Sequence, residues 1–258
     1  PGIWFRPLLT CDRLPEGAEL VRSDMSGAGE VMDPTHAHTL EQVAADVGRI
    51  AEWGYRLIKH DFSTYDALGG PTARDGWHFA NRGVTGAQAI KRLYEVIARA
   101  AGDAVVIGCN TFGHLAAGIH AIQRTGEDTS GRSFEWTRRA GTNNFLRLPQ
   151  NGALFQIDSD CAAFTDRVPH GLNLDFMEAC AITGSALFAS VTPGCLNAEE
   201  MRRIRGIYRV AAQPGNDARP LDWMRTRSPS RFEWMGRERR FNWYAGYHGA
   251  RMNLTWME

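Results

Sequence analysis

The sequence predicts an α/β protein with the architecture of a (β/α)8 TIM barrel. Strand-like and helix-like segments alternate along the 258 residues, with long loops after the strands and short turns after the helices, which is typical of repeated βα units. Residues 55–61 form a nearly continuous apolar run that ends on a carboxylate, as expected for a parallel strand covered on both faces. About six strands are recognisable, whereas the fold requires eight. We therefore expect a barrel truncated at its N-terminus, with the first two βα units missing.

Changes of periodicity and capping residues delimit the expected elements. The strands, in chain order, are expected at residues 2–9, 55–61, 104–109, 119–123, 153–157 and 185–191. The helices are expected from the N-cap Thr39, with Gln42 in a capping box, to Gly54, from the N-cap Thr85 to Gly102, and over 134–143, 172–183 and 198–211. A long polar loop precedes Thr39, and Asn197 with Glu200 forms the capping box of the last helix.

The βα pattern breaks after Pro214. Residues 231–234 and 241–244 alternate in polarity, which favours β-strands. We interpret residues 1–213 as a partial TIM-barrel domain, and residues 214–258 as a linker and the start of a C-terminal β-domain.

Composition excludes several classes of protein. The 29 Lys and Arg residues balance the 29 Asp and Glu residues and form no basic stripe, so we expect no nucleic-acid partner. No apolar run is long enough to span a bilayer and no signal peptide opens the chain, so no membrane partner is expected. The five cysteines lack the paired spacing of a zinc site, and we interpret them as free thiols. The compartment (secreted, periplasmic or cytoplasmic) and the oligomeric state stay open.

Polar residues gather at the ends of the expected strands, where barrel enzymes carry their active sites. These residues are Lys59 with Asp61, Cys109 with Asn110, Arg124 with Asp128, and Asp158 with Asp160. Two carboxylates facing one cavity, one kept ionised and one able to hold a proton, are what cleavage of a glycosidic bond needs. Lys59 supplies the cation for Asp61, because residues two apart on a strand point to the same face.

The spacing of these motifs resembles that of a known clan of enzymes. Gly2-Ile3-Trp4, LIKHDF (57–62), IGCN (107–110), Arg124 to Asp128, and Asp158-Ser159-Asp160 are similar, in the same order, to strand-end motifs of melibiase-type alpha-galactosidases, glycoside hydrolase families twenty-seven and thirty-six. The resemblance implies that Asp61 is the nucleophile and Asp128 the acid/base of a retaining alpha-glycosidase.

The same resemblance implies the substrate contacts. The substrate-binding residues it predicts are Trp4, Lys59, Cys109, Asn110, Arg124 and Asp160. In the clan, the position of Asn110 helps to choose between substituents at the second carbon of the sugar. The cysteine that follows the nucleophile in the clan is missing here, so its disulfide is expected to be absent. The paired second-strand aspartates that grip the sugar fall outside this chain, which leaves the identity of the sugar open.

The sequence is compatible with three functions. The first is a retaining alpha-glycosidase that hydrolyses an oligosaccharide or glycoside and requires no cofactor. The second is a metal-dependent barrel hydrolase that uses His36, His38, Asp158 and Asp160. The third is a non-catalytic carbohydrate-binding barrel, because a fold alone does not guarantee turnover. The aromatic residues Phe62, Tyr65, Trp77 and Phe112 could stack on sugar faces. His60 alternates to the face opposite Asp61 and is expected to pack behind the strand.

Overall fold

The computed structural model describes residues 1–22, 29–69 and 78–243, and the chain divides into two compact units. The first unit comprises Pro1–Arg124 with Gly152–Gln156, and the second comprises Thr125–Asn151 with Ile157–Glu258. Trp77 and the last part of the expected C-terminal β-domain, residues 244–258, lie outside the described residues.

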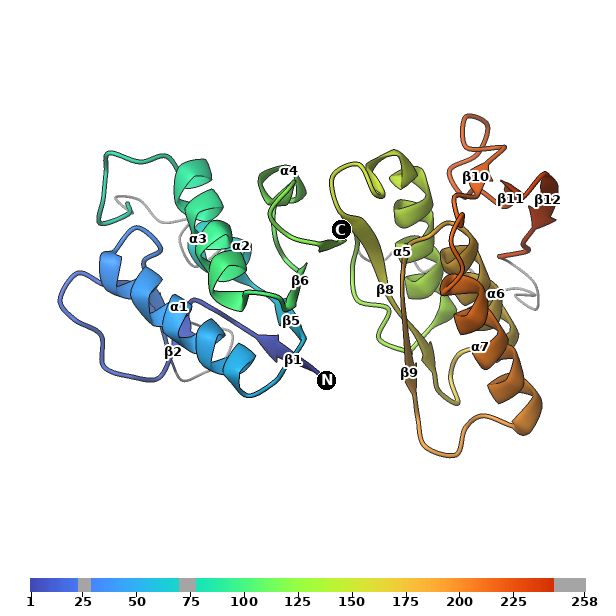
Figure 1. Ribbon diagram of the computed structural model, residues 1–258, viewed down its shortest axis with the longest axis horizontal. Helices are drawn as coiled ribbons and strands as arrows, with labels where there is room; N and C mark the ends of the chain where they lie inside the picture. The colour runs from blue at the N-terminus through green and yellow to red at the C-terminus, as the bar shows by residue number, and fades with distance from the viewer. Residues whose placement is uncertain (23–28, 70–77, 244–258) are drawn as a thin grey trace, which may run out of the picture. The chain divides into compact units, whose positions relative to one another are not determined.

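The first unit carries four parallel strands and the helices between them (Figure 1). Its parallel strands are β1 (Gly2–Phe5), β5 (Leu57–His60), β6 (Val105–Gly108) and β7 (Ile122–Arg124). Its helices are α1 (Ala37–Glu52), α2 (Ser63–Leu68), α3 (Gly86–Ala101) and α4 (Gly113–Ala116). A separate antiparallel sheet, in the order β2-β4-β3, consists of β2 (Leu9–Thr10), β3 (Glu19–Arg22) and β4 (Glu30–Met32).

The second unit contains two further parallel strands, three longer helices and a small antiparallel sheet. Its parallel strands are β8 (Gln156–Phe164) and β9 (Ala186–Val191). Its helices are α5 (Phe134–Leu146), the 3-10 turn η2 (Leu148–Gln150), α6 (His170–Ile182) and α7 (Ala198–Ala211). The antiparallel sheet consists of β10 (Arg219–Pro220), β11 (Arg231–Trp234) and β12 (Arg237–Arg240).

The described residues contain six parallel strands that alternate with helices, fewer than the eight of a complete barrel, and this arrangement confirms the predicted (β/α)8 pattern. Within the described residues β1 pairs only with β5, so the first strand is an edge strand, as in a barrel that lacks the βα units before it. Lys59 of β5 lies opposite Trp4 of β1 on one side and opposite Ile107 of β6 on the other. This register brings the carboxyl ends of β1, β5 and β6 to one edge of the sheet.

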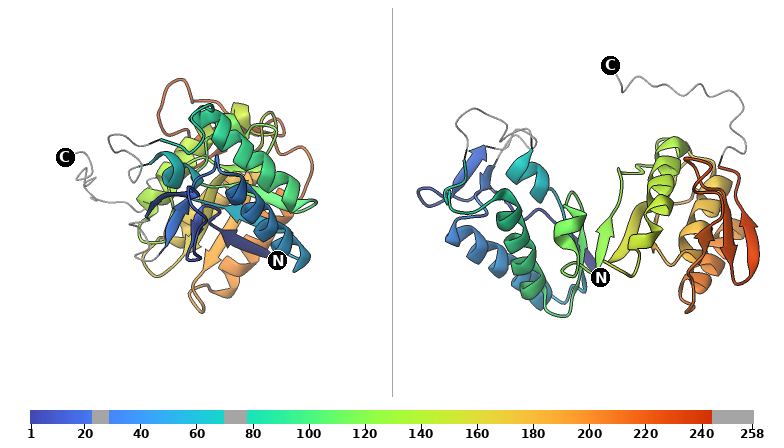
Figure 2. Two further views of the ribbon diagram at one scale, coloured as in Figure 1. Left: turned by 90° about the vertical axis from the view of Figure 1, so that its left-hand side faces the viewer. Right: turned by 90° about the horizontal axis from the view of Figure 1, so that it is seen from above.

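Each unit has its own apolar core. In the first unit, α1 and α3 lie side by side (Figure 1) and contribute Val43, Val47 and Leu93 to a cluster that also contains Ile58 of β5. Burying each such side chain stabilises the fold by about 1.5–3 kcal/mol. Figure 2 shows the same helices from two further directions.

The core of the second unit extends into the C-terminal antiparallel sheet. Phe232, Phe241 and Trp243 belong to the same buried cluster as Phe134 and Phe145. The Trp243 ring stacks on Phe145 at 5.8 Å between centroids. The proposed domain boundary after residue 213 stays a prediction.

Local expectations were wrong at two places near the N-terminus. Helix α1 begins at Ala37 with His36 as its N-cap, and Thr39 is a fully buried residue inside the helix. Tertiary burial thus overrides the capping preference of threonine. Part of the region expected to be a polar loop before this helix forms the sheet β2-β4-β3.

Strand β8 also differs from its expected position at residues 153–157. It begins at Gln156 and continues to Phe164, so Asp158 and Asp160 lie within the strand. The pairing with β9 shifts register between Asp158 and Cys161, which is a β-bulge. The bulge breaks the simple alternation by which two residues at positions i and i+2 of a strand, here Asp158 and Asp160, would share a face.

Candidate active site

Asp61 lies directly after β5, at the strand end predicted from the sequence. Its backbone N–H donates to the carbonyl of Phe5 at 2.9 Å, so the parallel pairing with β1 continues to this residue. The side chain is buried, with 5 % of its surface exposed. The position of the carboxylate is therefore determined by the sheet and not by a free loop.

Three donors converge on the Asp61 carboxylate. Trp4 Nε1 donates to Oδ2 at 2.9 Å, while Asn110 Nδ2 at 2.7 Å and the backbone N–H of Phe62 at 2.8 Å donate to Oδ1. Burial alone would raise the pKa of Asp61, but these hydrogen bonds and the positive charge of Lys59 together lower it below its ordinary value. Asp61 is consequently a carboxylate that remains ionised.

Unusual backbone conformations surround the predicted site residues. Five non-glycine residues of the described chain have positive φ, and four of them belong to the predicted site or lie within two residues of it: Phe62 (64°), Asn110 (49°), Ser130 (51°) and Asp160 (71°). Left-handed conformations cost of order 1–3 kcal/mol in non-glycine residues and cluster at functional sites. The surrounding contacts must therefore hold these loops in place.

Lys59, Cys109 and Arg124 add two cations and a thiol near Asp61. Burial raises the pKa of the Cys109 thiol to about 12, which the charges of Arg124 and Lys59 counteract only in part. Cys109 is thus a neutral thiol that interacts with the Asp61 carboxylate. Arg124 is buried at the end of β7. The structure brings these residues together with Asp61 in the first unit, as the sequence predicts.

A buried ion pair beside Asp61 was missed by the sequence reasoning. Arg6, which follows β1, donates from Nε and Nη2 to the two carboxylate oxygens of Asp66 at 2.9 and 2.6 Å. The guanidinium also lies over the Phe62 ring, 4.8 Å from its centroid. The hydrogen bond with Asp66 raises the pKa of Arg6, and the charge of Asp61 raises it further. Sixty residues separate the partners, so no local spacing could reveal the pair.

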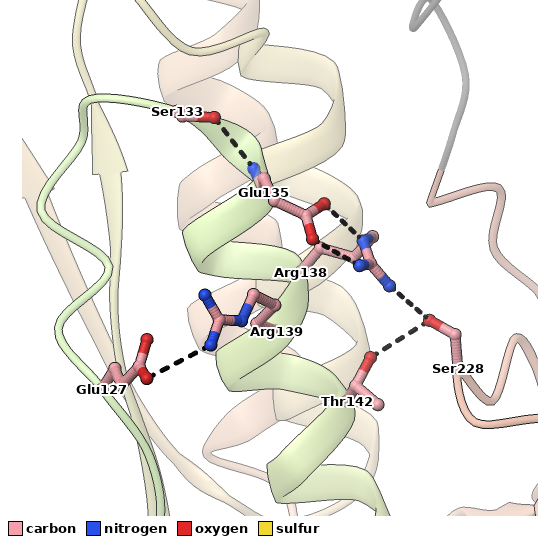
Figure 3. A network of polar contacts seen from close by, with 7 residues as sticks. All are labelled: Glu127, Ser133, Glu135, Arg138, Arg139, Thr142 and Ser228. Atoms are coloured by element: carbon pink, nitrogen blue, oxygen red, sulfur yellow. Dashed lines mark hydrogen bonds and ion pairs between the residues drawn. The ribbon is translucent and has the colours of Figure 1, made fainter. Parts of the chain in front are cut away.

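Asp128 lies in the second unit, in the loop between β7 and α5, and its side chain is exposed. The residues before and after Asp128 are each fixed by a polar contact. Glu127 forms an ion pair with Arg139 of α5 at 3.2 Å (Figure 3), and Thr129 donates from its backbone N–H to Asp160 Oδ2 at 2.8 Å. The loop is therefore tied to the helix that follows it and to strand β8.

The start of α5 is fixed by its own polar contacts, which Figure 3 also shows. Ser133 caps the helix by accepting from the backbone N–H of Glu135 at 3.2 Å. Arg138 pairs with Glu135 at 2.5 Å and donates to Ser228 Oγ at 3.2 Å, and the latter lies 3.1 Å from Thr142 Oγ1. These contacts give the Asp128 loop a fixed end point at the helix.

The two aspartates of β8 have structural contacts in addition to their predicted role. Asp158 is buried, and its Oδ1 accepts from the backbone N–H of Asp160 at 2.8 Å. Asp160 Oδ2 accepts from Thr129, so it holds the residue next to Asp128. The predicted contact of Asp160 with sugar stays a prediction.

The arrangement required for the metal-dependent alternative is not seen in the described part of the chain. No group of three or more His, Cys, Asp or Glu side chains there could hold a metal ion. His36 occupies the N-cap position of α1 without a side-chain capping bond, and His38 lies in the first turn of the helix. His60 is fully buried behind β5, as expected from the alternation. None of the five cysteines, all of which are among the described residues, forms a disulfide bond.

Comparison with known proteins gives matches among solved structures only. No family model and no curated protein matches the chain. The chain is similar to an alpha-galactosidase from Thermus thermophilus in complex with p-nitrophenyl alpha-D-galactopyranoside, with a TM-score of 0.65 and 21% identity over 95% of this chain and 51% of that chain. It is also similar to a GH27 beta-L-arabinopyranosidase from Geobacillus stearothermophilus, with a TM-score of 0.55 and 15% identity over 74% of this chain and 46% of that one.

A third similar structure is an isomalto-dextranase from Arthrobacter globiformis complexed with panose, with a TM-score of 0.59 and 14% identity over 89% of this chain and 46% of that one. The chain thus spans about half the length of the solved structures it resembles. At these identities the likeness establishes the fold: the chain has the fold of melibiase-type alpha-galactosidases, as part of a (β/α)8 barrel. None of the helices in the described residues is long and apolar enough to cross a membrane.

Proposed function

We propose that the protein is a glycoside hydrolase, and more specifically a retaining alpha-glycosidase that acts on terminal alpha-linked sugars of oligosaccharides or glycosides. The fold supports the first statement, because the solved structures that share it are glycosidases. The order of the strand-end motifs supports the second.

The observation that carries the proposal is the environment of Asp61. A nucleophilic carboxylate must be ionised and must not move during attack on the anomeric carbon. Asp61 receives hydrogen bonds from Trp4, Asn110 and the Phe62 backbone, and these contacts with Lys59 lower its pKa despite burial. Asp33, another buried aspartate of the first unit, also accepts three hydrogen bonds. What distinguishes Asp61 is that its donors hold it at the end of a parallel strand beside the cation Lys59.

In the proposed mechanism Asp61 attacks the anomeric carbon and Asp128 protonates the departing oxygen, which gives a covalent glycosyl-enzyme. Asp128 then deprotonates the water that releases the sugar with retained configuration. Lys59 and Arg124 would bind sugar hydroxyls, and Trp4, Cys109, Asn110 and Asp160 would line the substrate site. The reaction needs no cofactor.

The test uses the full-length protein and nitrophenyl alpha-glycosides, with and without a chelator. Asp61→Ala should abolish formation of the glycosyl-enzyme, whatever the leaving group. Asp128→Ala should lose about 10²–10⁴-fold on substrates whose leaving group needs protonation. With nitrophenolate as leaving group, this variant should show a burst followed by slow deglycosylation.

Azide separates the two roles. With Asp128→Ala, azide should attack the intermediate and give a glycosyl azide of retained configuration, whereas with Asp61→Ala it should give the inverted azide. Asp166→Ala, which removes an exposed aspartate of the second unit, serves as the matched control and should keep normal turnover. Near-normal turnover in both active-site variants would refute the proposal, and loss of wild-type activity with chelator would favour the metal-dependent alternative. Sugar binding without any turnover would favour the binding barrel.

A further inference from the structure

A cluster of three aromatic side chains lies behind β5 in the first unit. Tyr94 of α3 and His60 of β5 are fully buried, and His120, just before β7, is 2 % exposed. The Tyr94 ring lies 5.3 Å from the His60 ring and 4.8 Å from the His120 ring, centroid to centroid. These contacts fix the plane of the tyrosine ring from two sides.

The Tyr94 hydroxyl faces the loops that carry two of the proposed active-site residues. Its oxygen accepts a hydrogen bond from the backbone N–H of Phe112 at 3.0 Å. Burial raises the pKa of Tyr94, and the side chains of Thr64 and Ser63, in the first turn of α2, lie near enough to oppose this increase, although neither hydroxyl is hydrogen-bonded among the described residues. The Tyr94 hydroxyl is therefore hydrogen-bonded to the loop after β6 and lies beside the segment that follows β5.

The same two loops are joined next to the proposed nucleophile. The backbone N–H of Thr64 donates to the carbonyl of Asn110 at 3.2 Å. Asn110 in turn donates from Nδ2 to Asp61 Oδ1 at 2.7 Å. Phe112 follows Asn110 by two residues, and Thr64 follows Asp61 by three, so the Tyr94 contacts lie immediately beyond this pair.

Both loops also contain a residue with positive φ, Phe62 and Asn110. Such conformations persist only where surrounding contacts hold them. The only side-chain hydroxyl from a neighbouring helix that accepts a backbone hydrogen bond in the loop after β6, among the described residues, belongs to Tyr94. A hydrogen bond at this point opposes relaxation of the loop that carries Asn110.

We propose that Tyr94 is a positioning residue, whose hydroxyl holds the loop of Asn110 through the Phe112 backbone and thereby keeps the Asn110 amide against the Asp61 carboxylate. The inference rests on the proposed function of Asp61 as nucleophile. Tyr94 touches neither the substrate nor the reacting atoms, and acts through Asn110.

Tyr94→Phe removes the hydroxyl and keeps the ring contacts with both histidines. We expect kcat on a nitrophenyl alpha-glycoside to fall about tenfold or more, because small displacements of reacting groups are costly, while KM changes less than about twofold. The acid limb of the pH profile should move up by about one pH unit, since a weakened hydrogen bond to Asp61 stabilises its ionised form less. The titratable groups that face Asp61 in the first unit, Lys59, Arg6 and Cys109, are unchanged by the substitution.

Hydrogen exchange of backbone amides supplies a readout that does not depend on activity. The Phe112 amide and the loop that contains it should exchange faster in Tyr94→Phe than in the wild-type protein. Tyr208→Phe is the matched control, because it removes a tyrosine hydroxyl of α7 that interacts with the backbone at Ala189 in the second unit. It should leave the acid limb, kcat and the exchange of the Phe112 loop unchanged.

The outcomes separate this inference from the proposed function. If Asp61→Ala is inactive while Tyr94→Phe has normal kcat, an unmoved acid limb and unchanged exchange, the positioning role is wrong and the proposed function stands. If Tyr94→Phe loses activity only in proportion to loss of folded protein, with the acid limb unmoved, Tyr94 is merely structural and the inference also fails. Normal turnover in Asp61→Ala would overturn both.

Discussion

The neutral histidines His60 and His120 should make the stability of the first unit depend on pH. Burial is the main cause that lowers the pKa of both rings, and for His60 the charge of His120 lowers it further. The unfolded chain therefore binds protons at a higher pH than the folded chain. Stability is complete above the unfolded pKa of 6.5 and is lost as the pH falls toward the folded value, which for His120 is about 4.

The magnitude follows from the difference between the two pKa values of His120. One pKa unit corresponds to about 1.4 kcal/mol, so the interval from 6.5 to about 4 represents about 3 kcal/mol. About 2 kcal/mol of this is lost between pH 7 and pH 5. His60 contributes in the same direction. The pKa of the buried carboxylate of Asp61 is lowered from 3.8. Such carboxylates therefore lose their contribution to the free energy of unfolding mainly below about pH 5.

Urea unfolding followed by circular dichroism at pH 7 and pH 5 measures the effect. The free energy of unfolding of the wild-type protein should fall by about 2 kcal/mol or more, and His120→Phe should remove about that much of the fall. Because the comparison is between two pH values, a constant packing cost of the substitution cancels. His114→Phe replaces an exposed histidine and should keep the wild-type dependence. An equal fall in wild type and His120→Phe would refute the reasoning.

Two further predictions concern stability at neutral pH. Asp66→Asn leaves the buried Arg6 guanidinium without its anionic partner and should cost about 3 kcal/mol in urea unfolding; a loss below about 1 kcal/mol would show that the pair behaves like a weak surface pair. Gly108→Ala places a Cβ 2.6 Å from three polar side-chain atoms and should cost about 1–3 kcal/mol. Its control Gly48→Ala, in α1 with no atom within 4 Å of the new Cβ, should stabilise by about 0.5–1 kcal/mol, and equal effects of the two substitutions would contradict the assigned packing.

Elements with strong local signals were predictable from the sequence alone. Helix α7 spans Ala198–Ala211 as expected, and both reciprocal bonds of the Asn197/Glu200 capping box are present. Helix α3 likewise begins after Thr85 and ends at Gly102. These signals succeed because a capping box and a C-terminal glycine act between residues that are neighbours in sequence.

Signals that depend on distant partners were not predictable. Thr39 resembles an N-cap, yet it is buried inside α1, because the packing of that helix decides where it starts. The bulge at Asp160 arises in the pairing of β8 with β9 and has no counterpart in the polarity pattern. Trp77, an aromatic candidate for stacking on sugar, lies outside the described residues.

The sequence by itself determined the class of fold, the strand end at Asp61 and the order of the polar strand-end residues, since periodicity records which face of an element is buried and where it stops. Only the tertiary structure decided how the Asp61 carboxylate is held, by Trp4 and Asn110, which lie 57 and 49 residues away, and which backbone group the Tyr94 hydroxyl meets, the N–H of Phe112. Directed hydrogen bonds between remote segments depend on the register of paired strands and on loop conformation, and neither quantity leaves a periodic trace in the chain.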